Sequence, residues 1–180
     1  MIGGKGKKLN LINMERISKY ITYQEATRSQ KAIEKGIKNV PDVLAEQNMI
    51  FVATTVFDVC REYFGGALGV NSFFRNKEVN KLVGGSSTSQ HVTGSAIDIE
   101  AKKYGTTTNK ELFKFIAKNL DFDQLIWEYG DENEPSWIHV SSVKKGNRKM
   151  ILRAVKVKVV EKGKQVEKTR YIPIDKNFAD

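Results

Sequence analysis

The 180-residue chain has two histidines, and both stand in short segments whose spacing is typical of a metal site. One segment is Ser89–Asp98, with the sequence SQHVTGSAID, and the other is Trp137-Ile138-His139. Two imidazoles and one carboxylate can supply three ligands to zinc and leave a fourth tetrahedral position for a water, whose pKa the metal lowers to about 7. The fold must therefore carry His139 back against His91 and Asp98.

Each histidine also has an ordinary structural interpretation. His139 stands between Ile138 and Val140 in an apolar stretch, and such a histidine is more often a hydrogen-bonded core residue than a ligand. Taken together with Asp98, however, the two histidines favour a metal site.

Length and composition predict one domain with a small appendage, because 40% hydrophobic residues are ordinary for a globular chain. We expect a domain over residues 1–142, with a flexible amino-terminal tail, and an extension over residues 143–180. Cys60 stands among apolar residues at helical spacing, which indicates a buried thiol. The first residues carry no secretion-signal pattern, no segment is expected to span a membrane, and a monomer is expected.

The net charge of +9 is concentrated near the carboxyl end. Residues 144–170 contain eleven basic and two acidic residues, whereas the rest of the chain has nineteen of each. A local basic surface favours an anionic polymer such as nucleic acid or teichoic acid, or an acidic membrane face. A solvated hairpin whose lysines maintain solubility explains the same charges.

Hydrophobic periodicity predicts helices and an antiparallel sheet, without repeated βαβ units, so the fold class is α+β. Capping boxes at Thr22 and Thr108 predict helix starts. A core helix is expected from Pro41 to Gly65, where Leu44, Ile50, Ala53, Val56, Phe57, Cys60, Tyr63 and Phe64 recur at three- and four-residue intervals.

Alternating residues predict the strands that carry the site. A strand after Gly94 should place Asp98 on one face and Ile97 on the other. Strands over 123–128 and 137–141 should be neighbours, so that His139 and Asp98 meet across one sheet. Residues 150–160 and 165–174 predict a hairpin that turns at Lys162-Gly163.

The pattern Ser89-x-His91-x-x-Gly94-x-Ala96-x-Asp98, followed by Trp137-x-His139, resembles the zinc D-alanyl-D-alanine carboxypeptidase and L-alanyl-D-glutamate endopeptidase family, which includes phage endolysins. The likeness covers about residues 21–142. It implies that His91, Asp98 and His139 bind Zn²⁺ in a cleft on the sheet, on a fold shared with the hedgehog signalling domain. It also implies a substrate among the peptide stems of bacterial cell wall.

The catalytic base is the point at which the chain departs from this pattern. Many members place a carboxylate three residues before the last zinc histidine, but Ser136 stands there. Zinc hydrolysis needs a group that takes a proton from water and returns it to the leaving amine. We favour Glu128, because the segment that it ends resembles the hedgehog segment ending in a zinc-proximal glutamate. Glu134 is the second choice, and Asp131 and Glu132 are nearby; Glu128 could also be a surface carboxylate at a strand end.

Other residues of the motif suggest contacts with substrate. Arg75 matches an arginine that related enzymes use near the substrate carbonyl or carboxylate, although a surface cation on a turn is an equal alternative. Ser89 and Gln90 could orient a ligand or the substrate backbone. Trp137 could line the cleft or belong to the hydrophobic core.

The resulting hypothesis is a zinc metallopeptidase that hydrolyses peptidoglycan stem peptides, as a D,D-carboxypeptidase or an L-alanyl-D-glutamate-type endopeptidase. With no secretion signal expected, a phage or prophage lytic enzyme is favoured, held in the host cytoplasm before release to the wall or carried in a virion. One alternative is a catalytically weak or inactive zinc-scaffold module of a virion that binds or supports other components. Another is nucleic-acid binding through the basic hairpin.

Overall fold

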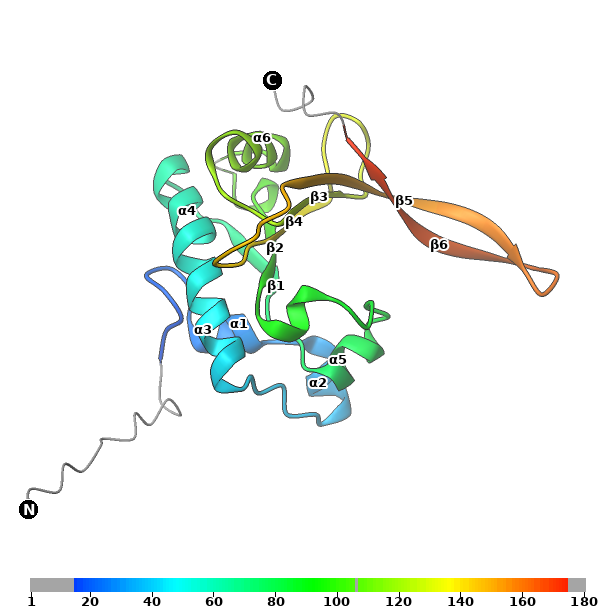
Figure 1. Ribbon diagram of the computed structural model, residues 1–180, viewed down its shortest axis with the longest axis horizontal. Helices are drawn as coiled ribbons and strands as arrows, with labels where there is room; N and C mark the ends of the chain where they lie inside the picture. The colour runs from blue at the N-terminus through cyan, green and yellow to red at the C-terminus, as the bar shows by residue number, and fades with distance from the viewer. Residues whose placement is uncertain (1–14, 106, 175–180) are drawn as a thin grey trace, which may run out of the picture.

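The computed structural model describes residues 15–105 and 107–174 (Figure 1). The flexible tail expected at the amino terminus, and the residues that carry no secretion-signal pattern, fall mostly in positions 1–14, outside the described residues. The helices are α1 (Tyr23–Thr27), α2 (Gln30–Lys35), α3 (Val43–Val52), α4 (Asp58–Phe64), α5 (Lys77–Leu82) and α6 (Asn109–Asn119), with shorter turns η2 (Ala53–Phe57), η3 (Gln90–Thr93) and η4 (Lys102–Tyr104). The strands are β1 (Gly69–Ser72), β2 (Ala96–Glu100), β3 (Gln124–Glu128), β4 (Trp137–Ser141), β5 (Met150–Glu161) and β6 (Lys164–Pro173). The fold is α+β, as the sequence predicts.

All six strands form one sheet in the order β1-β2-β4-β3-β5-β6. Neighbouring strands are antiparallel except for β3 and β5, which run parallel from the pair Gln124↔Met150 to the pair Glu128↔Ala154. The predicted hairpin therefore continues the main sheet, because its first strand adds to the free edge of β3. Strand alternation alone did not indicate this parallel pair.

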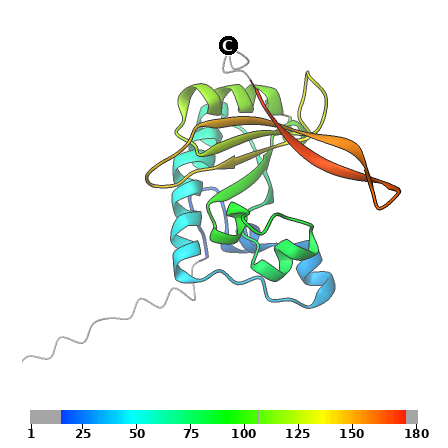
Figure 2. The same cartoon turned by 45° about the vertical axis from the view of Figure 1, so that its right-hand side comes forward.

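The two faces of the sheet have different partners. The face that carries the apolar residues packs against α6 and against the long helix of α3 and α4 (Figures 1 and 2). Its buried strand residues are Ile97, Ile99, Leu125, Trp127, Ile138 and Val140. Since side chains alternate along a strand, Asp98, Glu128 and His139 point to the opposite face, away from these helices.

The core helix forms one continuous helical run from Val43 to Phe64, and Gly65 ends it in a left-handed conformation with φ 66°. The run contains one π-helical turn, Ala53–Phe57, which shifts the helical register. Leu44 and Tyr63, two members of the apolar pattern on either side of this turn, are exposed. By length and composition alone this run could cross a membrane, which corrects the expectation that no segment could; here it packs against the protein core.

The hairpin of β5 and β6, residues 150–173, is called the arm. Its outer half extends away from the body of the molecule, as Figures 1 and 2 show in orange and red. It turns at Lys162 and Gly163, whose φ angles of 49° and 74° match the twist of a type I′ hairpin turn. The predicted turn position is therefore confirmed.

Candidate metal centre

Three predicted ligands converge on the face of the sheet opposite the helices. Asp98 on β2 and His139 on β4 are direct antiparallel partners, and His91 comes from the turn η3. His91 Nε2 lies 3.3 Å from Asp98 Oδ1 and 3.2 Å from His139 Nδ1. His139 Nδ1 lies 2.9 Å from Asp98 Oδ1. Side chains that are far apart in the sequence thus form a small triangle of ligand atoms.

Local structure fixes the direction of His91. Its Nδ1 lies 2.6 Å from the carbonyl oxygen of Phe73 and donates a hydrogen bond to it, so Nε2 carries the free lone pair. Gly94 ends η3 with φ 72°, and a Cβ at this position would lie 2.4 Å from the carbonyl oxygen of Ala45. The motif glycine therefore allows the close approach to α3 that holds His91 in place.

The geometry of the triangle fits a divalent metal. Ligands at about 2.0–2.1 Å from a tetrahedral zinc ion lie about 3.3 Å from one another, close to the three distances here. A shared proton can satisfy one side of such a triangle, but not three acceptor atoms at once. Although burial opposes ionisation of Asp98, the charges and hydrogen bonds of His91 and His139 hold its pKa well below the usual range. When both histidines are neutral, the cluster can present a carboxylate and two imidazole nitrogens to a cation.

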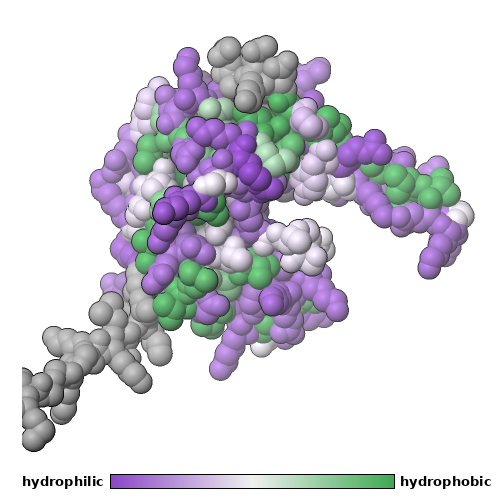
Figure 3. Space-filling model, viewed as in Figure 1, coloured by the Kyte–Doolittle hydropathy of each residue, from purple (hydrophilic) through white to green (hydrophobic). Residues whose placement is uncertain are grey.

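The triangle lies in an open cavity of about 930 Å³. One wall comes from the segment around Arg75 and from the loop before His91, the floor comes from β3 and β4, and the other wall comes from the arm. Figure 3 shows the hollow between the arm and the lobe that carries α5. The lining residues are Arg75, Val83, Gly84, Gly85, Ser86, Thr88, Ser89, Gln90, His91, Asp98, Gln124, Ile126, Glu128, Tyr129, Trp137, His139, Leu152, Lys156, Glu167, Lys168, Thr169 and Tyr171.

Glu128, the favoured base, lines this cavity. It ends β3 one strand away from His139, and only 7% of it is exposed. Burial raises the pKa of Glu128 to about 7, with a further contribution from the Asp98 charge, while the charges of His139, Arg75 and Lys156 oppose the rise. A carboxyl with this pKa can both accept and return a proton near neutral pH.

Arg75 also lines the cavity. Its backbone N–H donates to the carbonyl oxygen of His91 at 3.2 Å, which ties its segment to the ligand turn. The side chain is largely buried, and its Nε has no hydrogen-bond partner among the described residues. Burial lowers the pKa of Arg75, although the charges of Asp98 and Glu128 favour its cationic form. The guanidinium therefore has one buried donor without a protein acceptor among the described residues, on a residue that lines the cavity.

Three further predicted residues lie along the same cavity. Ser89 and Gln90 stand at the start of η3 beside His91, and the buried Oε1 of Gln90 has no partner among the described residues. Trp137 contacts Tyr129 edge-on, with ring centroids 5.2 Å apart. The structure thus brings Ser89, Gln90 and Trp137 to the cavity.

The acidic loop between β3 and β4 has another role. The carboxylate of Glu134 accepts hydrogen bonds from the backbone N–H groups of Asn109 and Lys110, at 2.8 and 3.3 Å, and so caps the start of α6. Asp131 accepts hydrogen bonds from backbone groups within its own loop. Neither residue lines the cavity, and neither do Glu132 and Ser136. The structure thus separates Glu134, the second candidate base, from the ligand triangle.

The contribution of the arm to the cavity was not predicted from the sequence. Lys156, Thr169 and Tyr171 belong to the hairpin that was expected to be an appendage. Alternation along the hairpin could have grouped them on one face. However, only the pairing of β5 with β3 places that face beside Glu128, and this pairing has no local sequence signal.

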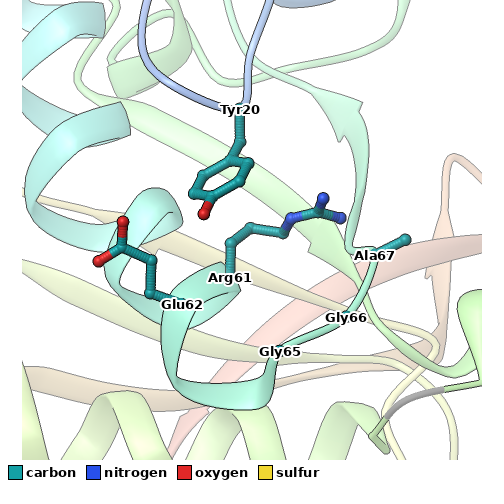
Figure 4. A pocket seen from close by; sticks show the side chains of 6 residues that line it. All are labelled: Tyr20, Arg61, Glu62, Gly65, Gly66 and Ala67. Carbon is teal, nitrogen blue, oxygen red and sulfur yellow. The ribbon is translucent and has the colours of Figure 1, made fainter.

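A second pocket, of about 340 Å³, lies at the end of α4 (Figure 4). Arg61 stacks over the ring of Tyr20 at 5.0 Å, and Glu62 pairs with Lys19 at 2.9 Å. The lining contains one carboxylate and no histidine or cysteine, so it lacks the ligand set of the larger cavity.

Comparisons with known proteins agree with the ligand geometry. A family model described as Peptidase M15 matches residues 19–141, which is more than half of the chain. No curated protein matches the sequence significantly. The matched segment contains the three ligands, Glu128 and Arg75, and it ends at the last residue of β4, before the arm begins.

Proposed function

This chain belongs to the Peptidase M15 family, and we propose that it is a zinc peptidase that hydrolyses peptide bonds in the stem peptides of bacterial peptidoglycan. The convergence of His91 Nε2, Asp98 Oδ1 and His139 Nδ1 in one cavity carries this proposal. The family supports a metal-dependent peptidase of this broad kind. From the motif resemblance, we further propose a lytic enzyme of a phage or prophage.

Different residues of the cavity can carry out different steps of hydrolysis. A zinc ion held by the triangle would supply Lewis acidity, which polarises a carbonyl and acidifies a water. Glu128 accepts the proton that the attacking water loses and delivers it to the leaving amine. The raised pKa of Glu128, about 7, suits both transfers, because the group is then neither a very weak base nor a very weak acid near neutral pH.

Arg75 supplies positive charge at the other wall of the cavity. Because Arg75 lines the cavity, its guanidinium can donate to a substrate oxygen, either the oxygen that gains charge during attack or a terminal carboxylate. In the first case the Arg75→Gln variant loses kcat, and in the second it mainly raises KM for substrates with a free carboxylate.

The direct test is cleavage of purified muropeptides, followed by mass spectrometry, together with metal content by elemental analysis. We expect one equivalent of zinc and cleavage of a peptide bond in the wild type, and loss of both in His91→Ala. Gln47→Ala, an exposed truncation on α3, serves as the matched control and retains both.

The same experiment distinguishes an active peptidase from an inactive zinc-binding module. Activity that persists in His91→Ala, or in metal-free wild type, overturns the metallopeptidase assignment. Bound zinc without cleavage of any muropeptide favours the inactive virion module instead. The position of Glu128 in the cavity, with its pKa raised to about 7, supports the active enzyme.

A further inference from the structure

The inner face of the arm continues the face of the sheet that carries the metal ligands. Asp98 pairs with His139, which pairs with Ile126, which pairs in turn with Leu152 on β5. Two residues further along β3, Glu128 pairs with Ala154 on β5, and Ala154 pairs with Tyr171 on β6. Because directly paired residues of a sheet point to the same face, Tyr171 shares its face with Glu128 and the ligands.

Only a methyl group separates Tyr171 from Glu128 along this row. Ala154 stands between them and is fully buried. Strands are about 4.8 Å apart, so two strand steps place the two backbones about 10 Å apart, with little side chain between them. Tyr171 is about half-exposed and lines the cavity. Tyr171 and Glu128 therefore line one cavity from the same face of the sheet, on either side of Ala154.

The environment of the Tyr171 phenol keeps it protonated. Burial raises the pKa of Tyr171 to about 12, and the carboxylates of Glu128 and Asp98 contribute to this rise, while the charge of Arg75 opposes it. The hydroxyl thus remains protonated at neutral pH and is a hydrogen-bond donor.

Contacts at the base of the arm connect its two strands to the residue that follows β3. The Tyr129 hydroxyl and Thr169 Oγ1 are hydrogen-bonded at 2.8 Å, and the Tyr129 backbone N–H donates to the carbonyl oxygen of Ala154 at 3.1 Å. Lys156 Nζ lies 5.0 Å from the centroid of the Tyr129 ring. The arm is therefore attached to the end of β3, next to Glu128.

We propose that Tyr171 is a catalytic residue of the hydrolysis inferred above, contributed by the arm, with its hydroxyl donating a hydrogen bond to the carbonyl oxygen of the scissile bond. The inference rests on the proposed function. During attack, the water oxygen bonds to the carbonyl carbon, the C–N bond then breaks, and the proton lost by water passes through Glu128 to the amine. Tyr171 keeps its own proton and stabilises the negative charge on the carbonyl oxygen.

Tyr171→Phe tests this role, because it removes only the hydroxyl. Tyr63→Phe, on the exposed side of α4, removes an equivalent hydroxyl outside the cavity and serves as the control. The readouts are kcat and KM on a muropeptide, zinc content, and calorimetric affinity for a phosphinate analogue of the cleaved dipeptide, which mimics the tetrahedral geometry of attack.

In Tyr171→Phe we expect kcat to fall by roughly 100- to 1,000-fold, and phosphinate affinity to fall as well. KM and zinc content should stay close to those of the wild type, and Tyr63→Phe should match the wild type in every readout. An unchanged kcat, or an effect on KM alone, overturns the role of Tyr171. Absence of cleavage in the wild type instead overturns the proposed function, so the two failures are distinguishable.

Discussion

Each histidine presents a particular ring nitrogen to the candidate metal centre. His91 offers Nε2 because the carbonyl oxygen of Phe73 engages Nδ1, and His139 offers Nδ1 toward the same point. A hydrogen bond of this kind fixes both the tautomer and the ring orientation of a ligand. The Phe73 carbonyl is therefore as much a part of the site as the three ligand side chains.

At the same scale, Glu128→Gln should separate catalysis from metal binding. The amide cannot accept the proton of the attacking water, so kcat should fall by about 100- to 10,000-fold, with zinc content unchanged. Glu134→Gln is the matched control from the neighbouring loop. It weakens the cap of α6 and should cost about 1 kcal/mol in the free energy of unfolding, while kcat is retained. Equal activity of Glu128→Gln and the wild type would assign the base elsewhere.

The pH profile of kcat/KM follows from the same carboxyl group. A base acts in its ionised form, so activity is retained above its pKa and lost as pH falls through it. Burial raises this pKa to about 7, and a bound cation would draw it lower, so the acidic limb should have its midpoint at or below about pH 7. A rate that stays constant from neutral pH to far below the ordinary pKa of glutamate, about 4.3, would contradict this assignment.

At the scale of elements, Gly94 controls how η3 meets α3. Gly94→Ala should be more destabilising than Gly36→Ala in thermal or urea unfolding. Both glycines have positive φ, which costs a non-glycine residue about 1–2 kcal/mol, but only at Gly94 would the new Cβ also meet backbone, the carbonyl oxygen of Ala45. Zinc content should fall as well, because His91 lies on the displaced turn. Equal destabilisation of the two variants would show that the close contact has no energetic consequence.

Local signals in the sequence predicted most elements correctly. The capping boxes at Thr22 and Thr108 have both of their reciprocal hydrogen bonds, and the alternation around Asp98 and His139 predicted their shared face. These features depend on neighbours within a few residues. The π-helical turn at Ala53–Phe57 and the parallel pairing of β3 with β5 could not be predicted in this way, because both depend on packing between distant segments.

The same limit explains what was missed in the site. The motif predicted His91, Asp98 and His139 as ligands, because their residue types and spacing are typical of metal sites, and the structure brings these three side chains together. The cavity location of Glu128 depends on β3 lying beside β4, and that of Tyr171 depends on the arm joining β3. Resemblance to a known segment was enough to predict Glu128 as a site residue. No feature of the sequence indicated that Tyr171 lines the same cavity.

At the scale of the whole molecule, the arm joins the basic surface to the cleft. Within the described residues, Lys156 pairs with Glu167, and Lys168 pairs with Glu161, but Lys158, Lys162 and Lys164 have no acidic partner within 4 Å. If the substrate is cell wall, we propose that these lysines contact an anionic wall polymer. Long-range attraction of this kind weakens with added salt.

This contact predicts a charge-specific effect. Combined substitution of Lys158, Lys162 and Lys164 by Gln should weaken binding to purified teichoic acid at low salt. It should also reduce the slope of log K against log salt by about one unit per lysine. The control replaces Lys35, Lys38 and Lys81 by Gln, which changes the net charge equally but leaves the arm intact. If both triple variants lose affinity equally, net charge alone accounts for the attraction.

The parallel pairing of β3 with β5 also has a consequence for synthesis. A nascent chain that has emerged only through Ser141 contains all three ligands and Glu128, but its β3 is an open sheet edge with free N–H and C=O groups. Residues 150–154 must leave the ribosome before that edge is covered, and Tyr171 follows later still. The cavity around the candidate ligands therefore cannot be complete until both strands of the arm have been synthesised and have paired with β3 and with each other.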